Sequence, residues 1–276
     1  MAGLKQIIGR LAGRPFKERV VYTCMFGFSE AFKDRSYQKY ENTDYICFTD
    51  DRSLKSQLWQ FVYVDTREHG PQKTSKLVKI CPHLFLADYQ TSLYVDNTVR
   101  INVPLDRIFF HLSDQTPFVT YRHDVWDCAY RESDAVIDAK YADPNILRSQ
   151  ITEYQRDGLP EHAGLYHSAV LLRNHHHRLV KNFGTLWFRE IEKYSYRDQV
   201  ALSYLVWKHG FKLSFFKGFS TDDNLVFWPE DVGPRLPRGF VEETYLRLNP
   251  NVSLHEMTAR EHFLKIGYDL GLPWQE

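Results

Sequence analysis

The sequence predicts an α/β fold in which one sheet carries helices on both faces. Short apolar runs alternate with segments of helical periodicity, a pattern typical of α/β sheets. Several of these runs end in carboxylates or glycine, which would gather polar groups at one edge of the sheet. A chain of 276 residues with 15% aromatic side chains can also bury a substantial core. We therefore expect one large domain, or one domain with an appendage.

In the first half of the chain, strands are expected where β-branched and aromatic residues form short runs. These runs are residues 19–24, 44–49, 58–64 and 92–95, with a possible edge strand at 98–103. Residues 73–85 have apolar positions at helical spacing, and Pro82 should kink or end that helix.

The second half continues the alternation. Strands are expected at 117–121, 165–173 and 212–216, and helices at 145–157, 177–191 and 197–208. Proline and glycine then gather in WPEDVGPRLPRGF, a linker-like composition, and 242–272 reads as two short helices. Three consecutive histidines, 175–177, are interpreted as a loop because adjacent residues point in different directions.

Charge and cysteine content exclude several classes of protein. Thirty-five basic residues balance thirty-five acidic ones, so no nucleic-acid partner is indicated and a charged partner must be met locally. The four cysteines are widely spaced, as reduced thiols of the cytoplasm would be. No apolar run is long enough to span a membrane. The basic, weakly amphipathic segment 1–16 is interpreted as a leader that permits peripheral membrane contact.

The central stretch 73–101 carries the first candidate site. A helix bearing Lys76 and Lys79 leads into a strand that ends in Asp96 and Asn97. Ligands of α/β sheets bind outside the carboxyl ends of strands, and lysines suit phosphate oxygens. The same residues also fit a solvated helix face followed by an Asp-Asn turn.

Two later segments add candidates. YRHDVWDCAYRE, at 121–132, contains His123 and Asp127 in an unusually dense mixture of charged and aromatic groups. Asp198 and Gln199 lie in the first turn of an expected helix, where the macrodipole favours a negative charge. A capping role for Asp198 explains that placement equally well.

In their order, these motifs resemble the TOD/MUCI glycosyltransferase-like family, of the GT-A class of sugar-nucleotide glycosyltransferases. The resemblance spans about residues 19–216. It is carried by VVYTCMFGF, DYICFTDD, KTSKLVKICPHLFLADYQTSLYVDN, YRHDVWDCAYRE, DGLPEHAGLYHSAVLLRNH and SYRDQV. It implies a GT-A-like domain at 17–235 with a single Rossmann-type mixed sheet. The tail, 236–276, is similar to a short helical module of bacterial glycan-related proteins.

The resemblance also implies roles for individual residues. The residues implied in holding the nucleoside are Thr23, Phe26, Gly27, Asp50 and Asp51. Those implied near the diphosphate are Lys73 and Lys76, and Asn97 is a further residue expected to bind the donor. Asp96 stands for the first carboxylate of a D-x-D motif that would bind Mn²⁺ or Mg²⁺, although Thr98 replaces the second acid. Asp198 and Gln199 would face the sugar, and the residues expected at the sugar or acceptor are His123, Asp127, His167 and Arg173.

The sequence therefore predicts transfer of a sugar from a UDP- or GDP-linked donor to a glycan or lipid-linked glycan. Bacterial surface polysaccharide is the expected product, made in the cytoplasm or at the inner face of the membrane. One alternative is a hydrolase that uses Asp96 with Asp198 or Glu132 as acid and base. Another is a degenerate domain that binds a nucleotide or glycan without turnover. A nucleophilic pair of Cys128 and His123 is a further alternative.

Overall fold

The computed structural model describes most of the chain between residues 17 and 275. The described residues are 17–27, 31–34, 42–220, 224–228, 236, 239–252, 254, 257–267 and 272–275. The predicted leader, 1–16, lies outside them. No helix within the described ranges is long and apolar enough to cross a membrane.

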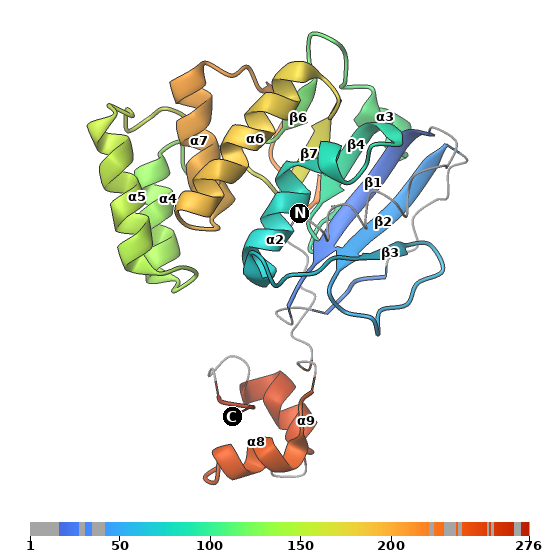
Figure 1. Ribbon diagram of the computed structural model, residues 1–276, viewed down its shortest axis with the longest axis vertical. Coiled ribbons are helices and arrows are strands. Elements are labelled where there is room, and N and C mark those ends of the chain that lie inside the picture. The colour runs from blue at the N-terminus through green and yellow to red at the C-terminus, as the bar shows by residue number, and fades with distance from the viewer. Residues whose placement is uncertain are drawn as a thin grey trace.

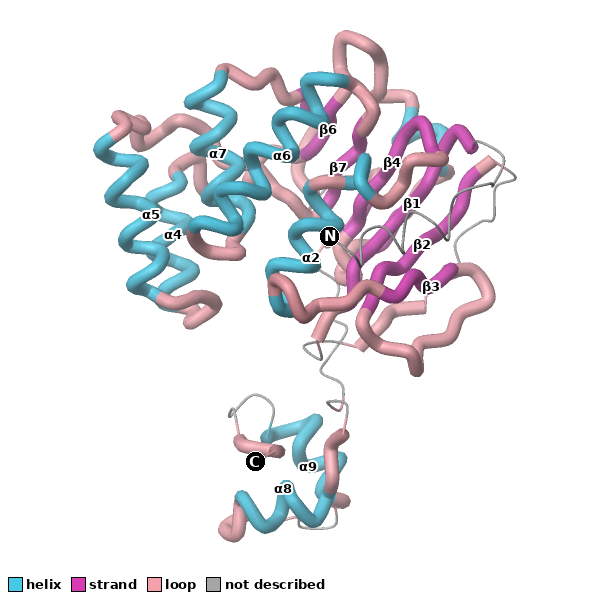
Figure 2. Tube along the Cα trace, viewed as in Figure 1, coloured by secondary structure: helices cyan, strands magenta, loops and turns pink. Residues whose placement is uncertain are grey.

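A seven-stranded mixed sheet forms the centre of the molecule (Figures 1 and 2). Its strands, in spatial order, are β3 (Gln60–Tyr63), β2 (Thr43–Thr49), β1 (Lys17–Met25), β4 (Tyr89–Val95), β7 (Val170–Arg173), β6 (Phe118–Thr120) and β8 (Ser214–Phe215). The first four run parallel, whereas β7 is antiparallel to both β4 and β6. This arrangement confirms the predicted α/β fold with one mixed sheet.

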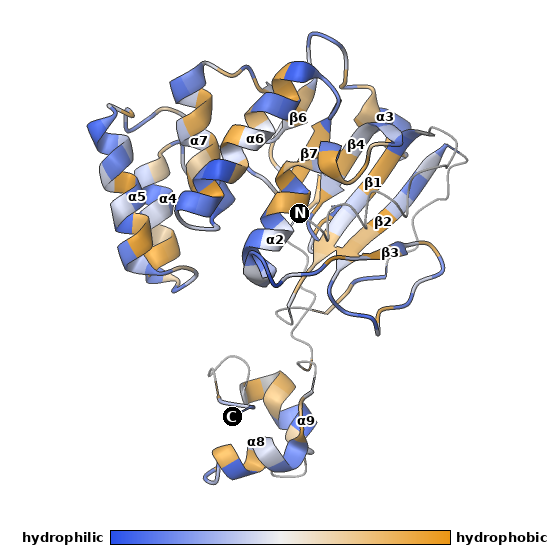
Figure 3. Ribbon diagram, viewed as in Figure 1, coloured by the Kyte–Doolittle hydropathy of each residue, from blue (hydrophilic) through white to orange (hydrophobic). Residues whose placement is uncertain are grey.

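Both faces of the sheet are buried, and β1 shows why. Val20 and Tyr22 point into one hydrophobic core, while Val21 and Met25 belong to the core on the opposite face. Successive side chains of a strand point to opposite faces, so a run such as RVVYTCM can serve two cores at once. Figure 3 shows the resulting apolar colouring along β1 and β7.

The larger core is closed by a row of helices. These are α2 (Gly70–Ile80), α6 (Arg178–Lys193), α7 (Asp198–His209), α4 (Ala129–Asp138) and α5 (Pro144–Arg156). α2 packs on α6, α6 on α7, α7 on α4 and α4 on α5 (Figure 1). α3 (Leu105–Phe109) contributes its buried residues to the core on the other face.

Three predicted elements are corrected. The expected helix at 73–85 starts earlier and ends at Ile80, and Pro82 opens the separate 3₁₀ turn η1 (Pro82–Leu84), because proline cannot continue the helix. The expected edge strand at 98–103 is only β5 (Arg100–Ile101), which pairs with β9 (Val226–Phe227) in a second small sheet. The strand expected at 165–173 is regular only in β7.

The C-terminal segment packs around a cluster of its own. It contains α8 (Glu242–Leu248), α9 (Ala259–His262) and the π-helical η2 (Phe263–Gly267), as the sequence predicts in outline. Tyr245 and Phe263 form the centre of this cluster, and Tyr245 is hydrogen bonded to His262. A domain boundary near residue 235 stays a prediction. All four cysteines are free thiols, as expected.

The contact between α2 and α6 is unusually close at Gly184. A Cβ atom on Gly184 would lie 2.8 Å from the backbone oxygen of Ile80, closer than packed atoms approach. Because glycine has only a hydrogen atom in place of a Cβ, the carboxyl end of α2 can lie directly against α6.

We predict that Gly184→Ala lowers the free energy of unfolding by about 1–3 kcal/mol, because the backbones must separate. Urea denaturation would measure the change. Thr185→Ala is the matched control, since Thr185 is exposed on the same helix, and it should stay within about 0.5 kcal/mol of wild type. A more stable Gly184→Ala protein, which helix propensity alone would give, would contradict this account.

Candidate functional site

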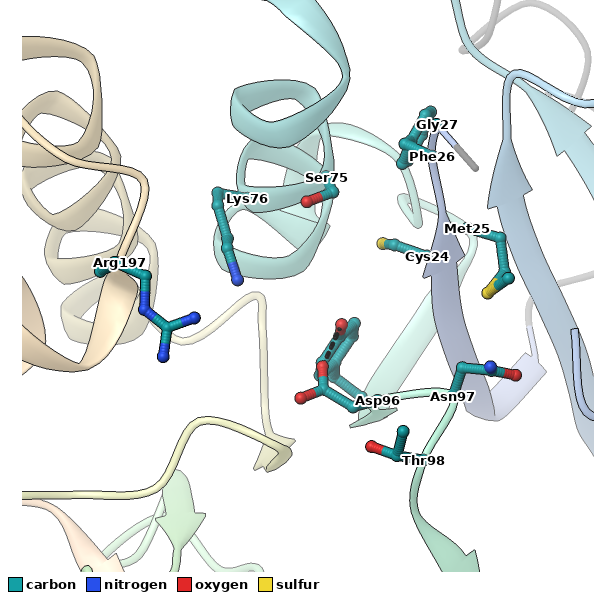
Figure 4. A pocket seen from close by; sticks show the side chains of 11 residues that line it. Cys24, Met25, Phe26, Gly27, Ser75, Lys76, Asp96, Asn97, Thr98 and Arg197 are labelled. Atoms are coloured by element: carbon teal, nitrogen blue, oxygen red, sulfur yellow. Dashed lines mark hydrogen bonds between the residues drawn. The ribbon is translucent and has the colours of Figure 1, made fainter. Parts of the chain in front are cut away.

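A cavity lies beyond the carboxyl ends of β1 and β4, where the strand order reverses. The chain runs outward from β1 to β2 and β3 and then returns to β4 on the other side of β1. Loops leave in opposite directions at such a switch point, so a crevice forms between them. The cavity has a volume of about 320 Å³. Its lining includes Cys24, Phe26, Gly27, Ser75, Lys76, Tyr94, Asp96, Asn97, Thr98 and Arg197 (Figure 4).

A cluster of two lysines and two carboxylates reaches this cavity through Lys76 and Asp96, which line it. Lys79 Nζ lies 2.8 Å from an oxygen of Asp198 and 3.5 Å from Oδ1 of Asp96. Lys76 Nζ lies 3.4 Å from the other oxygen of Asp198. Lys76 and Lys79 are one turn apart on α2, so their side chains share a face. The structure thus brings together two acids that are 102 positions apart in the sequence (198 − 96 = 102).

The members of this lysine–carboxylate cluster differ in burial. Lys79 is 2% exposed and Asp198 is 4% exposed, whereas about a third of the Asp96 side chain, 34%, is open to the cavity. The predicted alternative of a solvated lysine face is therefore wrong for Lys79. Asp198, which was expected to face the sugar, lies behind Lys76 and Lys79.

Burial and charge oppose each other in the pKa values of this cluster. Burial alone would raise the pKa of Asp198, but the positive charges of Lys76 and Lys79 outweigh it and hold that pKa far below its ordinary value. Burial likewise lowers the pKa of Lys79, but Asp198 and Asp96 reverse the shift and raise it. For Lys76 burial prevails, and its pKa is lowered despite Asp198.

Arg197 completes the basic side of the cavity and was not predicted from the sequence. It directly precedes the first turn of α7, beside Asp198, and in Figure 4 its guanidinium points, like Lys76, toward Asp96. One guanidinium nitrogen also lies 4.0 Å from Glu132, whose pKa burial raises. Its position directly before Asp198 was the only signal available in the sequence.

The loop after β1 forms the opposite wall. Gly27 has φ of +69°, which favours glycine, and its backbone N–H donates to both oxygens of Asp50 at 3.2 and 3.3 Å. Phe26 lines the cavity beside it. Phe26 and Gly27, which were predicted to hold the nucleoside, therefore lie at the site. Asp50 contributes indirectly, because its carboxylate fixes the backbone of Gly27.

Asn97 ties a separate segment to the end of β4. Its Oδ1 accepts a hydrogen bond from the backbone N–H of Lys33 at 2.8 Å, and its Nδ2 donates to the carbonyl of Ala31 at 2.7 Å. The side chain lines the cavity, but its amide oxygen and nitrogen are hydrogen bonded to residues 31–34. Asn97 is thus a structural residue of the cavity wall.

Several predicted site residues lie elsewhere. Thr23 is buried on the face of β1 opposite to Cys24. Asp51 is buried and accepts hydrogen bonds from Ser53, which closes a turn. Lys73 was expected at the diphosphate, but its Nζ donates to the carbonyl of Glu192 at 2.8 Å. These three residues are not among those that line the cavity.

Arg173 is the clearest correction. It was expected to contact the sugar or acceptor, but it is 1% exposed and lies inside the core. It donates to the hydroxyl of Tyr22 and to the carbonyls of Lys79 and Ile80, at 2.7 and 3.4 Å for the carbonyls. The last carbonyls of a helix lack partners within it and attract a cation. Arg173 therefore fixes the end of α2, and with it Lys79.

His123 and His167 stack on each other at a ring distance of 4.6 Å. With Asp124 they form the one group among the described residues whose ligating atoms, all within 4.8 Å, could hold a metal ion. His123 Nδ1, however, accepts the backbone N–H groups of Val125 and Trp126 at 3.2 and 3.0 Å, and His167 Nε2 is hydrogen bonded to Asp124 at 3.1 Å. Burial lowers the pKa of His123 to about 4. Hydrogen bonds thus engage one ring nitrogen of each histidine in this group.

Asp127 and Gln199, the remaining predicted residues, are not among the lining residues. Asp127 is exposed and pairs with His162 at 2.7 Å. Gln199 is half-buried in the first turn of α7. Sequence reasoning placed both by motif order, which carries no information about the direction in which a side chain points.

The fold and the site together define an α/β protein with a central mixed sheet and a cavity lined by acidic and basic residues at the switch point of that sheet. Residues 17–225 match the family described as the TOD1/MUCI70, glycosyltransferase-like domain. The match covers most of the sequence, and the chain belongs to this family. No curated protein matches the chain in sequence.

Three solved structures that are similar to this chain are glycosyltransferases. The apo structure of the WbbM bifunctional glycosyltransferase is 10% identical with a TM-score of 0.44, over 72% of this chain and 39% of that one. The apo form of mouse xyloside xylosyltransferase 1 is 11% identical with a TM-score of 0.41, over 75% and 86%. The galactosyltransferase LgtC, in complex with donor and acceptor sugar analogues, is 12% identical with a TM-score of 0.37, over 67% and 70%. This chain thus spans well under half of the WbbM chain.

We predict that Asp198→Asn lowers the free energy of unfolding by about 3 kcal/mol at neutral pH, because it leaves buried Lys79 short of a counter-charge. Folding lowers the pKa of Asp198, so its contribution is fully present above the ordinary carboxyl pKa of about 4 and is lost as the pH falls further. The gap between wild type and variant should therefore be constant from about pH 5 to 8 and shrink below about pH 4.

Urea titrations at several pH values would measure that gap. Asp134→Asn, at an exposed position of α4, is the control and should change stability by less than about 0.5 kcal/mol at every pH. A gap that widened on acidification would show that Asp198 is protonated in the folded protein.

Proposed function

We propose that the protein is a glycosyltransferase that moves a sugar from a nucleoside diphosphate sugar to a glycan acceptor. One observation carries the proposal: Lys76 and Arg197 face Asp96 across a cavity at the switch point of the sheet. Family membership supports the reaction class. A shared fold does not identify the sugar donor. The charges of the cavity are the evidence for a donor that carries a diphosphate.

A diphosphate matches the basic side of this cavity. The ammonium of Lys76 and the fork of Arg197 are donors suited to phosphate oxygens. The backbone turn at Gly27 and the ring of Phe26 offer an apolar and amide surface to the nucleoside. Asp96, partly open to the cavity, is suited to accept hydrogen bonds from sugar hydroxyls.

Asp198 has a positioning role in this proposal. Its carboxylate is ion-paired with both Lys76 and Lys79, and its pKa lies far below neutrality, which suits neither a proton acceptor nor a proton donor. It fixes the position of the Lys76 ammonium through an ion pair of 3.4 Å and partly offsets the effect of burial on that lysine's pKa. Gln199 follows it and remains a candidate for the sugar or acceptor side.

We extend the proposal to the setting of the reaction. UDP- and GDP-linked sugars are the expected donors, and a glycan or lipid-linked glycan is the acceptor. The likeness of the C-terminal segment to modules of bacterial glycan-related proteins supports a surface polysaccharide as product. Four free thiols are in keeping with a reducing cytoplasm.

We predict that Lys76→Met weakens binding of UDP- or GDP-sugars about tenfold or more, because a charge-assisted hydrogen bond to phosphate is lost. Isothermal titration calorimetry with the free nucleotides and their sugars would measure the dissociation constants. Lys73→Met separates the sequence expectation from the structure: it should change binding by less than about twofold. Lys181→Met, at an exposed position of α6, is the control.

Binding of none of these nucleotides would refute the proposal. So would release of free sugar from a glycan in the absence of any nucleotide, which is the expected result for the hydrolase alternative. Equal losses in the Lys73→Met and Lys76→Met proteins would contradict the assignment of the diphosphate to this cavity.

A further inference from the structure

The residues at the end of β4 do not fit a divalent metal ion. The family resemblance implies Mn²⁺ or Mg²⁺ on Asp96, but hard cations require several oxygen ligands. The place of a second acid is taken by Thr98. Oδ1 of Asp96 already accepts a hydrogen bond from the hydroxyl of Tyr94 at 2.6 Å and lies 3.5 Å from Lys79 Nζ. One partly engaged carboxylate is a poor donor set for such an ion.

A cation is nevertheless present between the two acids. Lys79 Nζ lies 2.8 Å from Asp198 and 3.5 Å from Asp96, donates to Ser168 Oγ at 3.1 Å, and sits 4.9 Å from the ring centre of Tyr94. Three oxygens and an aromatic face therefore surround it. An ammonium group has three hydrogens to donate, so little of its capacity is left unused.

The backbone of Lys79 is anchored as firmly as its side chain. Its carbonyl accepts hydrogen bonds from Tyr22 at 2.8 Å and from Arg173 at 2.7 Å. These two residues come from β1 and β7, and Gly184 brings α6 against the next residue, Ile80. The ammonium is thus held at a fixed point relative to the strand that bears Asp96.

We infer that Lys79 is a built-in cation that replaces the divalent metal, so that Lys76 and Arg197 bind the donor diphosphate without a metal ion. The inference rests on the proposed function for the identity of the ligand. Lys79 pairs with Asp96 and Asp198 and offsets one of their two negative charges, which would otherwise repel a diphosphate. Lys76, which also pairs with Asp198, and Arg197 then leave a net positive charge for the phosphate oxygens.

The charges in and below the cavity agree with this division. Lys76, Lys79 and Arg197 supply three positive charges against the two carboxylates of Asp96 and Asp198. Because the two acids raise the pKa of Lys79 above its ordinary value, it keeps its charge at neutral pH. Counted without Glu132, which lies 4.0 Å from Arg197, these groups have one excess positive charge for an anionic ligand.

The test is calorimetric titration of the full chain with UDP and GDP, once in EDTA and once in excess Mn²⁺. We expect dissociation constants that agree within about twofold. Binding that requires Mn²⁺, or that tightens more than about tenfold with it, would overturn the inference and leave the proposed function standing. If neither nucleotide binds under either condition, the proposed function fails.

Titration with Mn²⁺ alone tests the inference without any nucleotide. Wild type should show no stoichiometric site, whereas Lys79→Ala, which leaves Asp96 and Asp198 without their shared cation, should gain one. Lys79→Arg keeps a charge there and should gain none. A Mn²⁺ site in wild type that Asp96→Asn removes would overturn the inference, and so would a folded Lys79→Ala protein that fails to gain one. Near-ultraviolet circular dichroism would establish that each variant is folded.

Discussion

The ion pairs between Lys79, Asp198 and Asp96 are the interaction on which the architecture of the site depends. They join α7 to α2 and the end of β4, which lie more than 100 residues earlier in the sequence. A buried ion pair costs desolvation energy that a hydrophobic contact would not, so it is a poor device for stability alone. It does fix geometry, because each partner must lie where the others can reach it.

This requirement explains the supporting residues. Tyr22 and Arg173 hold the carbonyl of Lys79, and Arg173 also reaches Ile80. The missing side chain at Gly184 lets α6 press on the same turn. Tyr22, Arg173 and Gly184 do not contact the cavity, but they determine the position of Lys76, because Lys76 lies one turn earlier on the same helix.

The sequence was informative wherever one residue type has one physical consequence. Alternating β-branched runs predicted the central strands, Pro82 predicted the end of α2, and an acid after β4 predicted the place of the cavity. The lysines were harder to interpret. A spacing of three residues places Lys73 and Lys76 on the same face of the helix, but it does not predict which partner each side chain reaches. Lys73 turns to the end of α6, whereas Lys76 meets Asp198.

Other residues were beyond sequence reasoning because their partners are distant. Arg173 follows a strand and looks available for a ligand, yet the free carbonyls of α2 draw it inward. Arg197 lies in the motif SYRDQV, but its role depends on where α7 begins. The His123 and His167 stack likewise arises from a bridge between Arg122 and Tyr166 that no local pattern encodes.

The hydrogen bonds between Asn97 and residues 31–34 have a consequence for tryptophan fluorescence. The segment that Asn97 holds carries Phe32, whose ring packs edge-on against Trp59 at 6.1 Å, and Trp59 is buried against Tyr45 in turn. A molecule that displaces Asn97 would move Phe32 and so alter the surroundings of the indole. The emission of Trp59, one of six tryptophans in the chain, would then respond to a ligand that displaces Asn97.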